Sequence, residues 1–100
     1  MDTGRFDHGS IDDVIHSRIR LAVLSVLVSF EEAEFNFLKE QVGTTDGNLA
    51  THLGKLREAG YVATDRRKVE GRWLSWYRMT PTGRRAFERY VERLSRLLDR

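Results

Sequence analysis

A run of small, polar and basic side chains between residues 45 and 55 has the chemistry needed to bind a nucleic acid. An asparagine such as Asn48 can hydrogen-bond two atoms of adenine, and Thr51 can contact a base edge or a thymine methyl group. His52 and Lys55 can reach phosphates, which position a protein without reading sequence. Thr45 and the free amides at a helix start can also hold a phosphate. An ordinary solvent-facing helix would carry a similar mixture, so this run alone leaves both interpretations open.

Two glycines lie inside the same predicted helix, at Gly47 and Gly54. A glycine in a helix costs about 1 kcal/mol relative to alanine. Two of them in one short helix suggest the close approach of another helix or of a DNA backbone.

Four basic side chains surround the tip of a predicted β-hairpin: Arg66, Arg67, Lys68 and Arg72. A basic loop between two strands suits a minor groove or a phosphate track, and each neutralised phosphate adds about 0.9 to the salt slope of binding. The alternative is an edge strand that its charges protect against aggregation. Of the two interpretations, we predict contact with DNA.

Residues that could support catalysis or bind a metal are few and scattered. The three histidines, His8, His16 and His52, do not share a helix face at ligand spacing, and the chain has no cysteine. No glycine-rich stretch carries the lysine of a phosphate-binding loop. The adjacent carboxylates of Asp12 and Asp13 would point apart on a helix. We therefore predict no catalytic residues, no metal site, no cofactor and no enzymatic activity.

Length and charge limit what the chain can be. One hundred residues, 40% of them hydrophobic and 32% charged, suffice for one domain with one modest core. Residues 1–40 carry four basic and eight acidic side chains, whereas residues 41–100 carry thirteen basic and seven acidic ones. This asymmetry favours a basic face directed at a polyanion, although a salt-bridged, solvated surface would have the same composition.

The sequence contains neither a membrane span nor a secretion signal. Its longest apolar stretch, from Leu21 to Phe30, is interrupted by two serines and is too short to cross a bilayer. Residues 1–10 are polar and lack the layout of a signal peptide. We therefore expect a cytoplasmic protein without a membrane partner.

The first part of the chain predicts an arm and then a helix. Residues 1–10 are expected to form a flexible arm. Apolar residues recur every three or four positions over residues 11–30, as on a buried helix face, and Ser17 can cap the main part of that helix. Glu31 and Glu32 then predict a polar turn.

Two shorter helices follow, joined by a tight turn. The first covers residues 35–42 and ends at Gly43, and the second covers residues 46–59 after a cap at Thr44 or Thr45. Such a pair has the layout of a helix-turn-helix, in which the second helix enters the major groove of DNA.

Two strands and a long helix complete the chain. An extended segment begins at residues 61–63 and continues into a charged stretch at residues 65–72, and a returning strand covers residues 73–79, with a turn near Glu70 and Gly71. The last helix covers residues 81–99, with Thr80 as its cap. The predicted order is α-α-α-β-β-α, a mainly α fold with a small β-hairpin.

Aromatic side chains on the second strand are expected to belong to the core or to an interface. Strand alternation puts Tyr77, Met79 and Trp73 on the inner face, and Leu74, Trp76 and Arg78 on the other. Stacking of Trp73, Trp76 and Tyr77 on unpaired bases is the alternative.

The last helix carries an apolar stripe beside several arginines. We predict that this stripe is a dimer interface; a helix lying on a membrane surface is the alternative. The residues of the predicted interface are Phe87, Tyr90, Val91, Leu94, Leu97 and Leu98.

Three stretches resemble winged helix-turn-helix regulators of the MarR and ArsR type. Residues 48–62, with their His-Leu, Glu-Ala-Gly and hydrophobic pair, resemble the reading helix and first wing strand of that group. Residues 76–84 (Trp-Tyr-Arg-Met-Thr-Pro-Thr-Gly-Arg) resemble the second wing strand and the next helix, and residues 15–21 resemble the opening helix. The likeness runs from about Ile11 to Leu98 and is greatest to stand-alone transcription regulators of about 100 residues.

The resemblance implies a winged helix-turn-helix fold, with a DNA-binding domain at residues 11–80 and a dimerisation helix of the same domain at residues 81–100. It implies a homodimer joined by its terminal helices. The implied contacts with double-stranded DNA are Thr45, Asn48, Thr51, His52, Lys55 and the wing from Arg66 to Arg72. Two departures are Ala50, where serine is common, and Asp46, where an uncharged polar residue is common. Without cysteine, the thiolate metal sensing of some ArsR-type proteins cannot operate.

We therefore predict a dimeric, sequence-specific regulator of transcription that acts as a repressor. Two alternatives stay open. In the first, the winged helix binds a protein partner. In the second, the protein is a sensor that holds a small-molecule effector in a cavity lined by Phe6, Phe30, Trp76 and Phe87.

Overall fold

Four helices and three strands follow one another in the computed structural model, which describes residues 11–99. They are α1 (Arg18–Phe30), β1 (Glu32–Glu34), α2 (Phe35–Val42), α3 (Asp46–Glu58), β2 (Val62–Val69), β3 (Arg72–Met79) and α4 (Pro81–Leu98). The predicted fold class is confirmed. The predicted arm at residues 1–10 lies outside the part of the chain that the structure describes.

Strand β1 is an element that the sequence did not predict. Glu31 and Glu32 were expected to form a polar turn, but Glu32 begins a strand that pairs antiparallel with β3, with Ala33 opposite Tyr77. The resulting sheet has the order β1-β3-β2. Glu31 reverses the chain after α1 with a φ of 66°. The strand has only three residues, too few to show an alternating pattern.

Three predicted helix caps are confirmed. The hydroxyls of Ser17, Thr45 and Thr80 each accept a hydrogen bond from the backbone amide three residues further on. Helix α1 therefore begins at Arg18 and not at residue 11. Gly43 ends α2 in the left-handed conformation, as expected of a glycine after a helix.

Residues 11–17 form turns that pack beneath the helices. The carboxylate of Asp12 accepts hydrogen bonds from the amides of Val14 and Ile15, and another from the hydroxyl of Tyr61 at 2.5 Å. Burial and this bond raise the pKa of Tyr61 to about 12. Asp12 is thus a structural acceptor that joins these turns to Tyr61.

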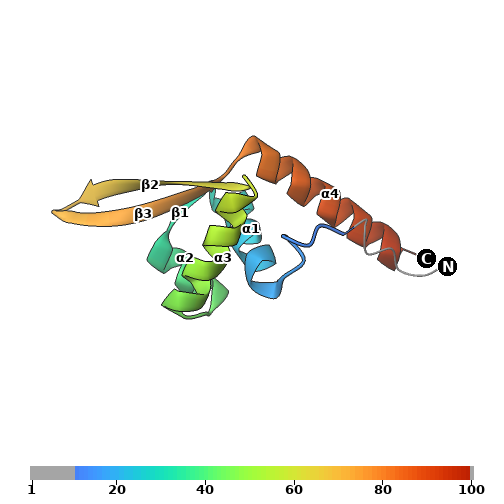
Figure 1. Cartoon of the computed structure of the whole chain (residues 1–100), viewed down its shortest axis with the longest axis horizontal. Helices are drawn as coiled ribbons and strands as arrows, with labels where there is room; N and C mark the ends of the chain where they lie inside the picture. The colour runs from blue at the N-terminus through green and yellow to red at the C-terminus, as the bar shows by residue number, and fades with distance from the viewer. Residues whose placement is uncertain (1–10, 100) are drawn as a thin grey trace.

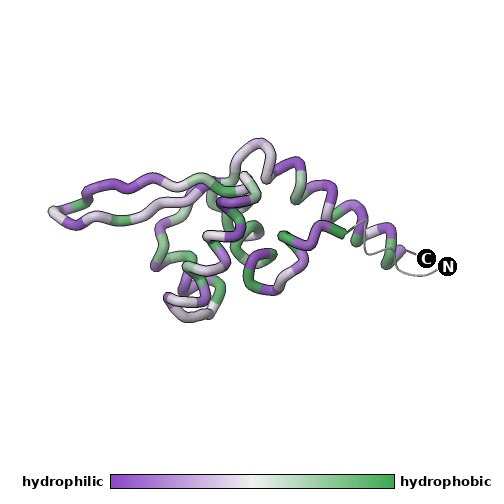
Figure 2. The backbone as a smooth tube through the Cα atoms, viewed as in Figure 1, coloured by the Kyte–Doolittle hydropathy of each residue, from purple (hydrophilic) through white to green (hydrophobic). Residues whose placement is uncertain are grey.

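The hydrophobic core lies between α1, α2, α3 and the base of the sheet. Figure 2 shows apolar backbone segments converging there, while the hairpin is largely hydrophilic. Each buried leucine contributes about 1.5–3 kcal/mol relative to an exposed one. The largest fully buried side chains are Ile15, Val23, Leu24, Leu27, Leu38, Leu49, Leu53 and Leu56.

The β2–β3 hairpin and helix α4 project from this core in opposite directions (Figure 1). The molecule therefore measures 58 × 25 × 23 Å. Glu70 and Gly71 turn the hairpin with φ values of 51° and 80°, the signs of a two-residue turn that matches the twist of the strands.

The start of α4 is docked on the backbone between α3 and β2. Thr80 makes two hydrogen bonds at this junction. Its amide donates to the carbonyl of Tyr61 at 3.0 Å, and its hydroxyl donates to the carbonyl of Gly60. A Cβ at Gly83 would lie 2.1 Å from the Tyr61 oxygen. Only glycine allows this contact, so the direction in which α4 leaves the core is fixed by close backbone packing.

Candidate nucleic-acid interface

Helix α3 turns its predicted contact residues outward. Its apolar side chains at Leu49, Leu53 and Leu56 are buried, which leaves the opposite side of the helix in solvent. The predicted residues that are exposed there are Thr45, Asn48, Thr51 and Lys55. A Cβ at Gly47 or Gly54 would meet no atom within 4 Å, so no other part of the described chain approaches these glycines.

The acidic charge of Asp46 is neutralised within the helix pair. Its carboxylate lies 2.8 Å from the ammonium of Lys39, which stands in the last turn of α2. An unpaired carboxylate at the start of α3 would repel a phosphate. The ion pair reduces that repulsion, and it joins α2 to α3 across the turn between them.

His52 makes a contact within the fold that the sequence did not indicate. It is half-buried, and its Nδ1 lies 2.9 Å from a guanidinium nitrogen of Arg20. Because arginine can only donate, the guanidinium of Arg20 donates to Nδ1 of His52, which must be unprotonated to accept. Burial lowers the pKa of His52, and the positive charges of Arg20 and Lys55 lower it further. His52 therefore positions α3 against α1 and does not supply a positive charge for phosphate.

Arg20 links three parts of the molecule, namely its own helix α1, the turns before it and helix α3. Besides His52, its guanidinium donates to the backbone carbonyls of Val14 and Asp13. These contacts attach α1 and the preceding turns to the helix that faces outward.

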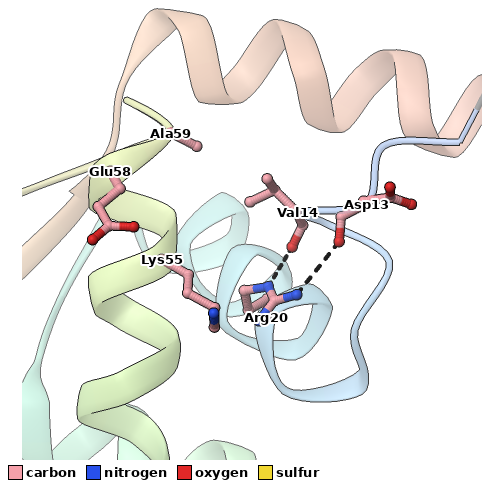
Figure 3. Close-up of a pocket in the computed structure, with 6 residues that line it drawn as sticks. All are labelled: Asp13, Val14, Arg20, Lys55, Glu58 and Ala59. Atoms are coloured by element: carbon pink, nitrogen blue, oxygen red, sulfur yellow. Dashed lines mark hydrogen bonds between the residues drawn. The ribbon is translucent and has the colours of Figure 1, made fainter.

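A pocket of about 390 Å³ lies beside Arg20, between the turns before α1 and the C-terminal half of α3 (Figure 3). It is lined by Asp13, Val14, Arg20, Lys55, Glu58 and Ala59. None of the described residues of the cavity that would support an effector, Phe30, Trp76 and Phe87, lines this pocket. Phe30 packs edge-on against Phe37, Trp76 lies beneath Arg67, and Phe87 lines a separate pocket between α1 and α4. Phe6 lies outside the described residues.

The four basic residues of the hairpin are divided between its two faces. In the strand register, Arg66 pairs with Ser75, and Lys68 pairs with Trp73. These residues lie on the same face of the hairpin as Val62 and Met79, a pair that is buried at the end of the hairpin next to the core. Because side chains alternate along a strand, the remaining two, Arg67 and Arg72, lie on the opposite face.

Arg67 is held by the chain itself. Its guanidinium binds the carboxylate of Glu32 at 2.7 and 3.1 Å and that of Asp65 at 2.9 Å, and it lies 4.8 Å from the ring centroid of Trp76. The hydrogen bonds to Glu32 and Asp65 raise the pKa of Arg67, and the same contact lowers the pKa of Glu32. Its charge is therefore already balanced by carboxylates within the chain, a contact that the sequence did not indicate.

The aromatic residues of β3 differ in how far they are exposed to solvent. Tyr77 and Trp76 are half-buried, in agreement with a structural role. Trp73 continues the inner face beyond the core and is 57% exposed, so it is not a core residue. The cationic groups of Arg66 and Lys68 lie 5.6 and 5.9 Å from its ring centroid.

Helix α4 leaves part of its apolar stripe in solvent. Val91 and Leu98 are 45% and 76% exposed, Leu97 is exposed, and Phe87 and Leu94 are half-buried. Tyr90 differs from these: it is 4% exposed, and its hydroxyl lies 2.9 Å from Nδ1 of His16. It belongs to the core of the subunit and has little surface left for the predicted interface.

Within residues 11–99, no helix is long and apolar enough to cross a membrane. Over the same residues, no cluster of three or more histidine, aspartate or glutamate side chains could hold a metal ion.

Comparison with known proteins gives consistent matches. A family model described as a winged helix DNA-binding domain matches residues 19–98. An uncharacterized protein of Methanocaldococcus jannaschii is 39% identical over 84 residues, which make up 84% of this chain and 91% of that protein. The resemblance inferred from the three sequence stretches is thereby confirmed.

Two solved structures illustrate the shared fold. A transcriptional regulator homologue from Pyrococcus horikoshii has a TM-score of 0.80 at 23% identity, over 86% of this chain and 85% of that one. The PcaV transcriptional regulator from Streptomyces coelicolor, in complex with its natural ligand, has a TM-score of 0.76 at 26% identity, over 90% of this chain. This chain spans only 62% of the PcaV chain.

Proposed function

The chain belongs to the family of winged helix DNA-binding domains, and from that premise we propose that it is a sequence-specific regulator of transcription that binds double-stranded DNA. The observation that carries the proposal is the exposed polar side of α3 next to a projecting basic hairpin (Figure 1). A helix of this kind fits the major groove, while the hairpin reaches the neighbouring backbone or minor groove.

In this proposal the first turns of α3 read the bases. Asn48 hydrogen-bonds adenine, and Thr51 contacts a base edge or a thymine methyl group. The hydroxyl and free amides at Thr45 and the ammonium of Lys55 bind phosphates. His52 acts through Arg20, by holding α3 at its angle to α1.

The hairpin supplies non-specific affinity. Arg66, Lys68 and Arg72 are exposed and provide positive charge to neighbouring phosphates. Arg67 acts as a positioning residue, because its guanidinium ties the hairpin to Glu32.

We also infer that the protein acts as a homodimer joined through α4. Val91, Leu97 and Leu98 offer apolar surface on a helix that projects from the core (Figure 1), and a partner copy would cover it. Two-fold symmetry would place two α3 helices one turn of DNA apart. A dimer bound across a promoter would block access to it, which makes repression the expected sign of regulation.

Salt dependence tests the DNA-binding proposal directly. The protein is titrated into a labelled duplex at roughly 50 and 200 mM salt, where about six phosphate contacts should cost about 10³-fold in affinity. Binding that does not weaken with salt, or no binding at the lower concentration, would favour the alternative in which this surface binds a protein through apolar contacts.

A second candidate function is regulation by a small anionic effector. The pocket beside Arg20 combines a guanidinium with the ammonium of Lys55, and both are adjacent to His52 on α3. A carboxylate that binds Arg20 would compete with His52 for the same donor and so disturb the position of α3. The complex of the PcaV regulator with its natural ligand supports the idea that such folds accept effectors.

Calorimetric titration with benzoate and with acetate tests this second function. Binding that Arg20→Gln abolishes, with a matching loss of DNA affinity in the wild type, would support it. Equal heats for the wild type and the variant would contradict it.

A further inference from the structure

Trp73 is the one aromatic residue of β3 that the fold of the described chain leaves largely in solvent. It lies two residues beyond the hairpin turn, and its Cα partner across the strands is Lys68. Burying an indole stabilises a protein, so an indole at the end of a projecting hairpin contributes little to this fold. Its position calls for a contact outside the subunit.

Two cations belong to the same face as this indole. Arg66 and Lys68 stand two residues apart on β2, and their charged groups lie within 6 Å of the Trp73 ring centroid. Attraction between the cations and the ring holds the three side chains together before any partner arrives. The partner must therefore offer an apolar surface bordered by negative charge.

A DNA strand at the edge of the minor groove has this chemistry. Its deoxyriboses and base edges are apolar or weakly polar, and its phosphates border them. Proteins that bind the minor groove frequently insert apolar side chains there beside basic ones. A protein partner with an acidic, apolar surface is the alternative, which predicts that Trp73→Ala leaves the affinity for a duplex unchanged.

We propose that the indole of Trp73 packs into the minor groove where the hairpin meets DNA, while Arg66 and Lys68 bind phosphates of the bordering strand. The proposal rests on the proposed function. It assigns the wing contact to the face of Arg66, Lys68 and Trp73, and leaves Arg72 and the tethered Arg67 on the other face.

The test compares Trp73→Ala with Val69→Ala, since Val69 is an exposed apolar residue near the same tip on the opposite face. Trp73→Ala should weaken binding to a duplex by about 5- to 30-fold, as expected for the loss of one aromatic contact with a nucleotide. It should leave the salt slope unchanged because no charge is lost. Val69→Ala should bind like the wild type, and Trp73→Phe should keep most of the affinity.

A second readout does not depend on the stability of the variants. Indole fluorescence of the wild-type protein should change when duplex is added, and that change should be absent in Trp73→Phe. Equal affinities for Trp73→Ala and Val69→Ala, with no fluorescence change in the wild type, would overturn the inference while leaving DNA binding intact. A wild type that binds no duplex would instead contradict the proposed function itself.

Discussion

Arg67 on β2 reaches across the central strand of the sheet to bind Glu32 on β1, with two hydrogen bonds of 2.7 and 3.1 Å. On the way its guanidinium covers the ring of Trp76, which belongs to the intervening strand β3. The contact joins the outer half of β2 to an edge strand outside the hairpin. We interpret this as the element that fixes the hairpin relative to α3.

Glu32→Gln should weaken DNA binding a few-fold, in proportion to the modest strength of an exposed ion pair. Charge alone predicts the reverse, because the substitution removes a negative charge from a protein that binds a polyanion. Faster hydrogen exchange of the β2 amides should accompany the loss. Glu70→Gln removes the same charge at the hairpin tip without touching Arg67, so it should strengthen binding or leave it unchanged. An equal gain for both variants would show that the tether has no role.

His52 should make stability depend on pH. The folded protein lowers the pKa of His52 below 6.5, so the folded state binds fewer protons than the unfolded state. The stabilisation that His52 contributes is therefore fully present above its pKa in the unfolded state, near 6.5. It is lost as the pH falls through the lower pKa of His52 in the folded state. His52→Asn, which keeps an acceptor for Arg20, should flatten this part of the profile of thermal unfolding. A wild-type profile without any slope between about pH 5 and pH 7 would contradict the role assigned to His52.

Gly47 should show opposite effects on stability and on binding. No atom lies within 4 Å of a Cβ built at this position, and alanine is the better helix former, so Gly47→Ala should stabilise the protein by up to about 1 kcal/mol. The same methyl group would stand on the side of α3 that faces DNA, so duplex affinity should fall. Chemical unfolding and a duplex titration measure the two effects. A more stable variant with unchanged affinity would show that DNA does not approach the start of α3.

Val91 should control assembly. Val91→Asp places a charge on the exposed apolar surface of α4, and we expect it to convert a dimer into a monomer in light scattering coupled to size exclusion. Arg85→Asp changes an exposed residue on the opposite side of the helix and should leave the mass of the wild type unchanged. A monomeric wild type would contradict the proposed interface outright.

Much of the fold could be predicted because its signals are local. Hydroxyl caps at Ser17, Thr45 and Thr80 and the turn at Glu70 and Gly71 depend on residues a few positions apart, and each appears in the structure as expected. Strand β1 could not be predicted, because its three residues become a strand only by pairing with β3, more than forty positions away along the chain.

The candidate site was predictable only in its composition. The sequence located the polar side of α3 and the basic hairpin, but it could not show which charges the fold already uses. Arg67 and His52 belong to the predicted set, yet their partners Glu32 and Arg20 lie 35 and 32 positions away. Lys39, which neutralises Asp46, carries no local signal of that role. Strand register, and not charge, separates Arg66 and Lys68 from Arg67 and Arg72.

Selection from a pool of random duplexes tests the central claim most directly. Protein-bound duplexes are recovered, amplified and sequenced over several rounds, and the enriched sequence is then compared with a scrambled one by titration. We predict an inverted repeat whose half-sites lie about 10 base pairs apart, bound far more tightly than the scrambled duplex, with Asn48→Ala reducing the preference. A pool that stays random, or equal affinity for the two duplexes, would contradict sequence-specific recognition by a dimer.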